Sequence, residues 1–253
     1  MKLTFLGTGT SHGVPVIGCD CEVCRSHDPR DHRLRSSALV ETSSTRLLID
    51  CGPDARQQLL KIPFRKIGGV LITHAHYDHV GGLDDLRAFC QFGDIDLYAN
   101  DVAAKSIRHN FPYYFEEKLY PGVPRFHLHE VPAHVPFRIG DQEIVPVSIM
   151  HDKLPIFGYR IGRLAYLTDV KTIPSAEYDY LKGIDTLVIS SLRWEVPHHS
   201  HLLVADAIAI ARRIGARRTY LMHLTHKIGL YDEASARLPE DVRLAYDGLT
   251  IEI

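Results

Sequence analysis

The sequence predicts an α/β protein in which layered β-sheets are covered by helices. Short apolar segments bounded by Gly, Pro, Asp and Asn recur along the chain, which is typical of strands separated by turns. Predicted helices are fewer and are interspersed among the strands, so sheets and helices are expected to pack in layers. No low-complexity linker or internal repeat is visible, which favours one domain over residues 1–253.

Hydrophobic periodicity gives the expected elements in chain order. Strands are predicted at residues 2–6, 37–42, 45–50, 68–73, 95–99, 126–131, 142–149, 156–161, 163–168, 185–190, 217–222, 242–246 and 249–253. Helices are predicted at residues 54–61, 80–91, 101–109, 174–182, 202–214 and 232–237. The helix at 202–214 is the clearest, because Val204, Ala207 and Ala211 share one face. Arginines occupy its last turn and Gly215 can cap its end.

Residues 84–130 differ in composition from the rest of the chain. They contain the aromatic run F-P-Y-Y-F at 111–115, and five Lys and Arg against eight Asp and Glu. We expect a packed, aromatic-rich lobe of the core. A wall over a pocket or an oligomer contact is the alternative.

Composition and charge exclude several classes of protein. Apolar residues make 45% of the chain and charged residues 24%, a globular mix that excludes disorder, collagen and coiled coil. The net charge of −2 argues against nucleic acid or an anionic membrane as the main partner. No apolar run approaches the ~18 residues of a membrane span. The first residues lack the features of a signal peptide, so we expect a cytoplasmic protein.

Three of the five cysteines form the motif C-x-C-x-x-C within a loop at residues 13–26: Cys19, Cys21 and Cys24. Three closely spaced thiols in a chain without a signal peptide favour zinc over disulfides. A fourth ligand must then come from elsewhere in the chain, and a loop of free thiols is the alternative. Cys51 and Cys90 stand alone beside apolar residues, as buried cysteines commonly do.

Histidine is abundant, with 16 residues, and several are concentrated after the predicted strand that ends at Thr73. Four candidate ligands follow within six residues: His74, His76, Asp78 and His79. Imidazoles and a carboxylate crowd together cheaply only around a cation. Alternate positions of such a loop can serve one metal and the next pair a second. A solvated polar loop is the alternative.

Three more candidate ligands come directly at the ends of apolar strands: His151, Asp169 and His223. Strand ends present polar side chains to a shared cleft. With the histidine loop they make seven ligands, which is too many for one catalytic zinc but suits two metals sharing a carboxylate. Nitrogen and carboxylate ligands suit zinc, manganese or iron.

These residues resemble the metallo-β-lactamase superfamily, whose signature loop is H-x-H-x-D-H. The similarity includes L-G-T-G-T near the start, I-D-C-G at 49–52, the signature at 74–79 and the three strand-end residues. The resemblance implies a four-layer αββα sandwich with the metals at one edge. It also implies two ligand sets, His74, His76 and His151 for one metal and Asp78, His79 and His223 for the other, with Asp169 bridging them.

A narrower resemblance comes from the motif G-V-P-x-x-G-C-x-C-x-x-C at 13–24. It is similar to the cyclic phosphodiesterase family of the carbon–phosphorus lyase pathway, which opens a ribosyl 1,2-cyclic phosphate. That resemblance implies His226 as the fourth ligand of a structural zinc. It implies His201 beside the leaving group, as general acid or phosphate donor, with His198 or His199 as alternatives.

The resemblance implies a hydrolase for a small cyclic phosphate or nucleotide-like ester, with His201 and Asp78 as its catalytic residues. Two divalent ions, manganese, zinc or iron, would activate a water that bridges them. A cofactor protein of pyrroloquinoline quinone biosynthesis shares the cysteine motif and is one alternative. A transfer-RNA 3′-processing nuclease, which the acidic balance of 84–130 disfavours, and a thioester or lactone hydrolase are the others. The family also suggests a homodimer.

Overall fold

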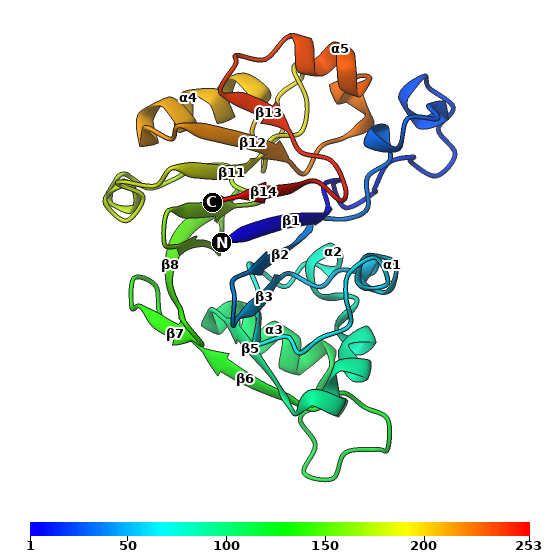
Figure 1. Cartoon of the computed structure of the whole chain (residues 1–253), viewed down its shortest axis with the longest axis vertical. Coiled ribbons are helices and arrows are strands. Elements are labelled where there is room, and N and C mark those ends of the chain that lie inside the picture. The colour runs from blue at the N-terminus through cyan, green and yellow to red at the C-terminus, as the bar shows by residue number, and fades with distance from the viewer.

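Two seven-stranded β-sheets pack face to face, and helices cover their outer faces (Figure 1). The structure is a computed structural model that describes residues 1–253. The strand orders are β14-β1-β2-β3-β4-β5-β6 in the first sheet and β13-β12-β11-β10-β9-β8-β7 in the second. Both sheets mix parallel and antiparallel pairs. The chain termini lie side by side because β14 pairs with β1 (Figure 1).

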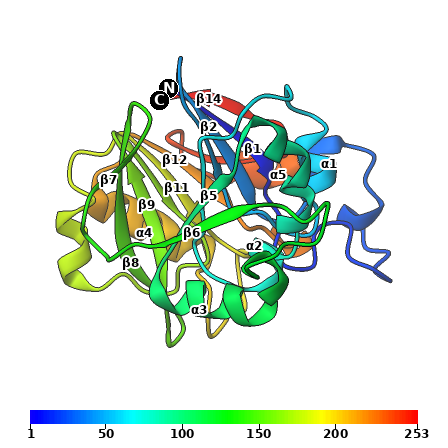
Figure 2. The ribbon, with the colours of Figure 1, turned by 90° about the horizontal axis from the view of Figure 1, so that it is seen from below.

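The first sheet is built mainly from the N-terminal half of the chain. Its strands are β1 (Lys2–Gly7), β2 (Ser37–Glu41), β3 (Arg46–Ile49), β4 (Gly69–Leu71), β5 (Ile95–Ala99), β6 (Phe126–Glu130) and β14 (Thr250–Glu252). Its helices are α1 (Ala55–Leu59), α2 (Tyr77–Val80), a 3-10 helix at Leu83–Phe92 and α3 (Asp101–Asn110). Helix α3 packs against β5 and β6 (Figure 2).

The second sheet is built from the C-terminal half. Its strands are β7 (Phe137–Ile139), β8 (Gln142–His151), β9 (Leu154–Ile161), β10 (Leu164–Leu167), β11 (Thr186–Ser190), β12 (Arg218–Met222) and β13 (Val242–Leu244). Helix α4 (Val204–Ile214) packs on β11 and β12, and α5 (Tyr231–Ala236) packs on β13. No helix combines the length and apolarity that crossing a bilayer requires.

Strand alternation divides the apolar core into three layers. Leu47 and Ile49 of β3 join the cluster between the sheets, whereas Leu48 joins the cluster under the helices of the first sheet. Ala165 and Leu167 of β10 pack in the same way under the helices of the second sheet. Because successive strand side chains point to opposite faces, each central strand can supply two layers. The predicted four-layer αββα sandwich is confirmed.

Two predicted helices were wrong in extent. The segment 80–91 is not one helix, because α2 ends at Val80 and a 3-10 helix begins at Leu83. Gly82 in between packs so closely against the Gly52 carbonyl that no Cβ would fit there. The segment 174–182 forms only a 3-10 turn at Ser175–Asp179.

All thirteen predicted strands are present, and the three-residue edge strand β7 is an addition. In the aromatic lobe, Phe111, Tyr114 and Phe126 pack into the core beneath the first sheet's helices, as expected of a packed lobe. The exposed Tyr120 lies outside that packing.

Candidate metal centre and adjoining pocket

Strand ends from both sheets meet at one edge of the sandwich. The turn after β4 carries His74, β8 ends at His151, and Asp169 and His223 follow β10 and β12. Strand β4 runs parallel to β3, and β10, β11 and β12 run parallel to one another. Side chains at the carboxyl ends of parallel strands converge on a shared cleft, which brings together residues far apart in the sequence.

Three residues at these strand ends have strained backbones. Asp50, Asp169 and His223 adopt left-handed conformations with φ of 58°, 54° and 56°. Such conformations cost a non-glycine residue about 1–3 kcal/mol and gather at functional sites. Asp169 and His223 belong to the second ligand group, and Asp50 contacts His79 of that group.

The first ligand cluster consists of His74, His76 and His151, with ligand atoms within 4.8 Å of one another. The His74 Nε2 and His76 Nδ1 atoms are 2.9 Å apart. His151 Nδ1 lies 3.0 Å from the Ser200 carbonyl and donates to it, so Nε2 remains available as a ligand. Burial, and then the charge of His79, lower the pKa of His74 well below its usual value. A neutral imidazole is the form that binds a metal.

The second cluster adjoins the first and consists of Asp78, His79, Asp169 and His223. His79 Nε2 lies 3.3 Å from Asp78 Oδ2 and 3.4 Å from Asp169 Oδ1. His223 Nε2 lies 3.2 Å from Asp169 Oδ2, and His74 Nε2 of the first cluster lies 4.0 Å from that same oxygen. Asp169 therefore faces both clusters, as a bridging carboxylate must.

Neighbouring charges outweigh burial in this cluster. Burial alone would raise the pKa of Asp169, but the charges of His223 and His79 hold it well below its usual value. Burial would likewise lower the pKa of His79, but the charges of Asp169, Asp50 and Asp78 raise it well above its usual value.

Buried polar atoms indicate that the second cluster fits a divalent cation. His79 Nε2 and both ring nitrogens of His223 are buried without a hydrogen-bond partner. Most buried polar groups are hydrogen-bonded, so such an exception calls for an explanation. Imidazole and carboxylate donors within ligand distance of one another are the set that zinc, manganese or iron prefers.

Asp50 is a part of the site that the sequence analysis did not assign. Its Oδ2 accepts hydrogen bonds from His79 Nδ1 at 2.7 Å and from the Thr73 hydroxyl at 2.8 Å. The proton on Nδ1 leaves Nε2 of His79 as the ligand atom. Asp50 follows strand β3 directly, so the strand-end pattern that selected Asp169 and His223 could have found it.

His201 lies against both clusters, whereas its two neighbouring histidines lie further out. Its ring stacks on His223 at 4.9 Å between centroids, and its Nδ1 is 4.0 Å from Asp169 Oδ2. It also forms a ligand-spaced group with His151 and Asp169, which the sequence did not indicate. Burial, and then the charge of His223, lower the pKa of His201 to about 3. His198 is half-buried beside it and His199 is exposed.

The cysteine loop meets the C-terminal half of the chain at His226. The Sγ atoms of Cys19, Cys21 and Cys24 lie 3.3, 3.3 and 3.4 Å from His226 Nδ1. Burial raises the pKa of the Cys24 thiol to about 11, whereas a hydrogen bond from the Cys24 backbone lowers that of Cys21. Three thiols and one imidazole are a tetrahedral zinc set. His226 comes three residues after His223, so one loop reaches both centres.

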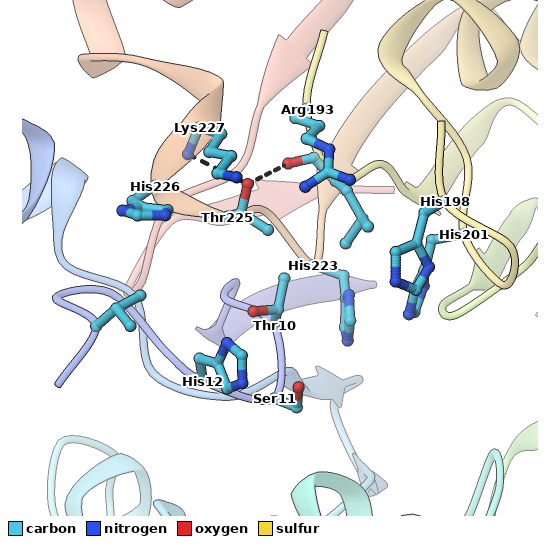
Figure 3. Close-up of a pocket in the computed structure, with 12 residues that line it drawn as sticks. Thr10, Ser11, His12, Arg193, His198, His201, His223, Thr225, His226 and Lys227 are labelled. Atoms are coloured by element: carbon cyan, nitrogen blue, oxygen red, sulfur yellow. Dashed lines mark hydrogen bonds between the residues drawn. The ribbon is translucent and has the colours of Figure 1, made fainter. Parts of the chain in front are cut away.

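A cavity of about 340 Å³ lies between the two centres (Figure 3). It is lined by Thr10, Ser11, His12, Val16, Leu192, Arg193, His198, His201, His223, Thr225, His226 and Lys227. Figure 3 shows His201 and His223 on one side and His226 and Lys227 on the other. The lining includes two cations, several hydroxyls and only two aliphatic side chains, and no carboxylate. Such a cavity suits an anionic, oxygen-rich group.

The fold and this edge of strand-end ligands together define a protein of the metallo-β-lactamase class. Residues 45–224 match the family model described as the beta-lactamase superfamily domain. The chain belongs to that superfamily and, within it, to the PhnP family, as the structural relative described next indicates.

One solved structure, described as a new diphosphatase from the PhnP family, is 38% identical, with a TM-score of 0.91 over 99% of this chain and 96% of that one. Zn²⁺-bound PqqB from Methylobacterium extorquens shares the fold, with 20% identity and a TM-score of 0.79 over 100% of both chains. An octanoyltransferase of Porphyromonas gingivalis is 44% identical over 98% of this chain. The chain spans about half of that protein's length, 51%.

Proposed function

We propose that the chain is a metal-dependent phosphodiesterase that hydrolyses a small cyclic phosphate or nucleotide-like ester. The observation that supports this most strongly is the position of the cavity with Arg193 and Lys227 beside two ligand clusters joined through Asp169. A cleft lined by cations attracts an anionic diester and disfavours substrates that carry no charge. The 38% identity to a diphosphatase supports phosphoryl chemistry as well.

Each ligand cluster would hold one divalent ion of manganese, zinc or iron. His74, His76 and His151 would hold the first, and Asp78, His79 and His223 the second, with Asp169 between them. Such ions activate water as a nucleophile near neutral pH and offset charge on the phosphoryl oxygens. Asp50 keeps the His79 proton on Nδ1, so that Nε2 faces the cleft.

His201 would donate a hydrogen bond to the substrate as a neutral imidazole. Because its pKa is lowered to about 3, the ring is uncharged near neutral pH and is a poor general acid. A neutral N–H directed at a phosphoryl or departing oxygen still stabilises the charge that develops there. Removing one such donor typically reduces the rate about 10²–10³-fold.

The cysteines and His226 would hold a structural zinc that fixes one wall of the cavity. His226 lines the cavity and lies 3.3–3.4 Å from the three sulfurs. The N-terminal loop, which also carries Thr10 and His12, would be secured there against the loop after β12. A structural zinc with four protein ligands has no open position for catalysis.

Acyl and polynucleotide substrates are less consistent with this site. The octanoyltransferase relative is about twice as long as this chain. Its name therefore describes a protein of which about half has no counterpart here. An octanoyl chain needs an apolar lining, but Val16 and Leu192 are the only aliphatic side chains of the cavity. An extended RNA would need many contacts between its phosphates and basic side chains, and a chain with a net charge of −2 has no excess of such side chains.

The decisive experiment is a substrate panel with purified protein supplied with Mn²⁺ or Zn²⁺. The panel contains bis(p-nitrophenyl) phosphate, a 2′,3′-cyclic nucleotide, a dinucleoside diphosphate and an octanoyl thioester. Asp78→Ala should abolish turnover, whereas Asp179→Ala, at an exposed ion pair with Lys182, should leave it unchanged. Turnover of the thioester alone by the metal-loaded protein would contradict the proposal.

A further inference from the structure

We propose that Lys171 is a positioning residue for His201, because it holds the backbone of the loop that carries this histidine. The loop, residues 191–203, joins β11 to α4 and contains no helix or strand. The inference rests on the proposed function, in which His201 contacts the substrate.

The contacts of the Lys171 ammonium are unusual for a lysine. Nζ donates to the carbonyl of His198 at 2.7 Å and to the carbonyl of His201 at 3.1 Å. Both hydrogen bonds go to the loop backbone, and neither goes to a carboxylate. A charged donor makes hydrogen bonds about twice as strong as neutral ones. The half-buried Lys171 is therefore placed to hold the loop at both ends of its histidine run.

The base of Lys171 is fixed to the metal-ligand segments. It lies two residues after Asp169, and its backbone N–H donates to the Met150 carbonyl at 2.7 Å. The Met150 N–H in turn donates to Thr172 at 2.9 Å. Met150 immediately precedes His151, so the lysine side chain extends from a backbone that two ligand segments share.

A second contact attaches the same loop to the centre. His151 Nδ1 donates to the Ser200 carbonyl at 3.0 Å. The carbonyls of residues 198, 200 and 201 thus accept from side chains rooted in the ligand segments. Irregular backbone without such donors opens more easily than helix or strand. The loop also includes Val196, which is exposed and has a left-handed φ of 64°.

Lys171→Met tests this role because it retains the aliphatic stem and removes only the donor. A displacement of about 1 Å in a reacting group can reduce the rate by about 10²-fold. We expect kcat on a diester to fall about 10–100-fold, with KM changed less than about 3-fold. Lys171→Arg keeps a charged donor and should restore most of the rate. Lys182→Met, at an exposed lysine paired with Asp179, is the matched control and should match wild type.

A double-mutant cycle separates positioning from general structural loss. In a His201→Ala background, Lys171→Met should change kcat by less than about 2-fold, since the residue that it positions is gone. Multiplicative losses, or a failure of Lys171→Arg to restore the rate, would overturn the proposal.

A readout without turnover keeps the inference separate from the proposed function. In metal-loaded Lys171→Met, amide hydrogen exchange at residues 196–202 should be faster than in wild type, with the same metal content. Unchanged exchange overturns the positioning role, even if the protein is an active phosphodiesterase. If Lys171→Met exchanges faster than wild type but wild type hydrolyses no diester, the loop contact is supported and only the proposed function is refuted.

Discussion

Replacing Asp50 by Asn tests how the second ligand cluster is oriented. Asp50 is fully buried behind His79 and accepts three hydrogen bonds. Its Oδ1 accepts from the Thr73 backbone at 2.8 Å, and its Oδ2 accepts from the Thr73 hydroxyl at 2.8 Å and from His79 Nδ1 at 2.7 Å. An asparagine has nearly the same shape but only one acceptor oxygen.

The geometry determines which contact the variant loses. The Thr73 N–H can only donate, so the amide oxygen must stay opposite it and the NH₂ group must face His79. The Thr73 hydroxyl can rotate to accept, but His79 Nδ1 can accept only if its proton moves to Nε2. That atom lies 3.3 Å from Asp78 Oδ2 and 3.4 Å from Asp169 Oδ1, where the metal would bind. Loss of such a supporting carboxylate weakens metal binding about 10–100-fold, which equals about 1.4–2.7 kcal/mol.

Titration of metal-free protein with Mn²⁺ or Zn²⁺, followed by calorimetry, measures this change directly. We expect the metal affinity of the second ligand cluster to weaken and that of the first cluster to stay near its wild-type value. Asp54→Asn is a matched control, because Asp54 is also buried nearby but pairs with Arg35 instead of a histidine. Equal metal affinities in folded Asp50→Asn and wild type would refute the orienting role of Asp50.

Three further predictions concern packing, the cysteine loop and pH. Gly52→Ala sets a methyl group against the Asp78 carbonyl, so the free energy of unfolding should fall about 1–3 kcal/mol, and an unchanged urea midpoint would contradict this close approach. His226→Ala should bind one zinc ion fewer per chain than wild type, as measured by elemental analysis. Equal zinc content in the two proteins would disprove the four-residue zinc site. Burial raises the pKa of Asp247 from 3.8 to about 6, so its stabilising contribution is complete below 3.8 and is lost as the pH rises through 6. Asp247→Asn should therefore gain up to about 3 kcal/mol over wild type at about pH 8 in chelator and little at about pH 4; equal gains at both pH values would argue against it.

Local patterns explain what the sequence alone could reveal. Alternation and turn residues located every predicted strand, and strand ends located Asp169 and His223. The break at residues 81–82 depends on contact with Gly52, some thirty residues earlier, and no periodicity shows it. Asp50 also follows a strand directly, but its partner His79 lies 29 residues away, so no spacing in the sequence pairs the two residues.

The fourth ligand of the cysteine loop shows the same limit. The three thiols require one more ligand to complete a zinc site, and the chain contains 16 histidines that could supply it. Only the family resemblance identified His226 among them. Lys171 and Arg193 gave no local signal, since their contacts form only when distant loops come together.

The spread of the ligands along the chain has a consequence for protein synthesis. Cys19 and His226 are separated by 207 positions, and the other centre is incomplete until His223 is present. Ribosomes add about 5–20 residues per second, N-terminus first. Strands β1 to β6 and the cysteine loop therefore emerge well before the loop after β12, and for that time their thiols and imidazoles lack their final partners. A polypeptide released between residues 151 and 223 would hold the first cluster, but it would lack both His223 and His226, so neither the second cluster nor the cysteine set could be completed.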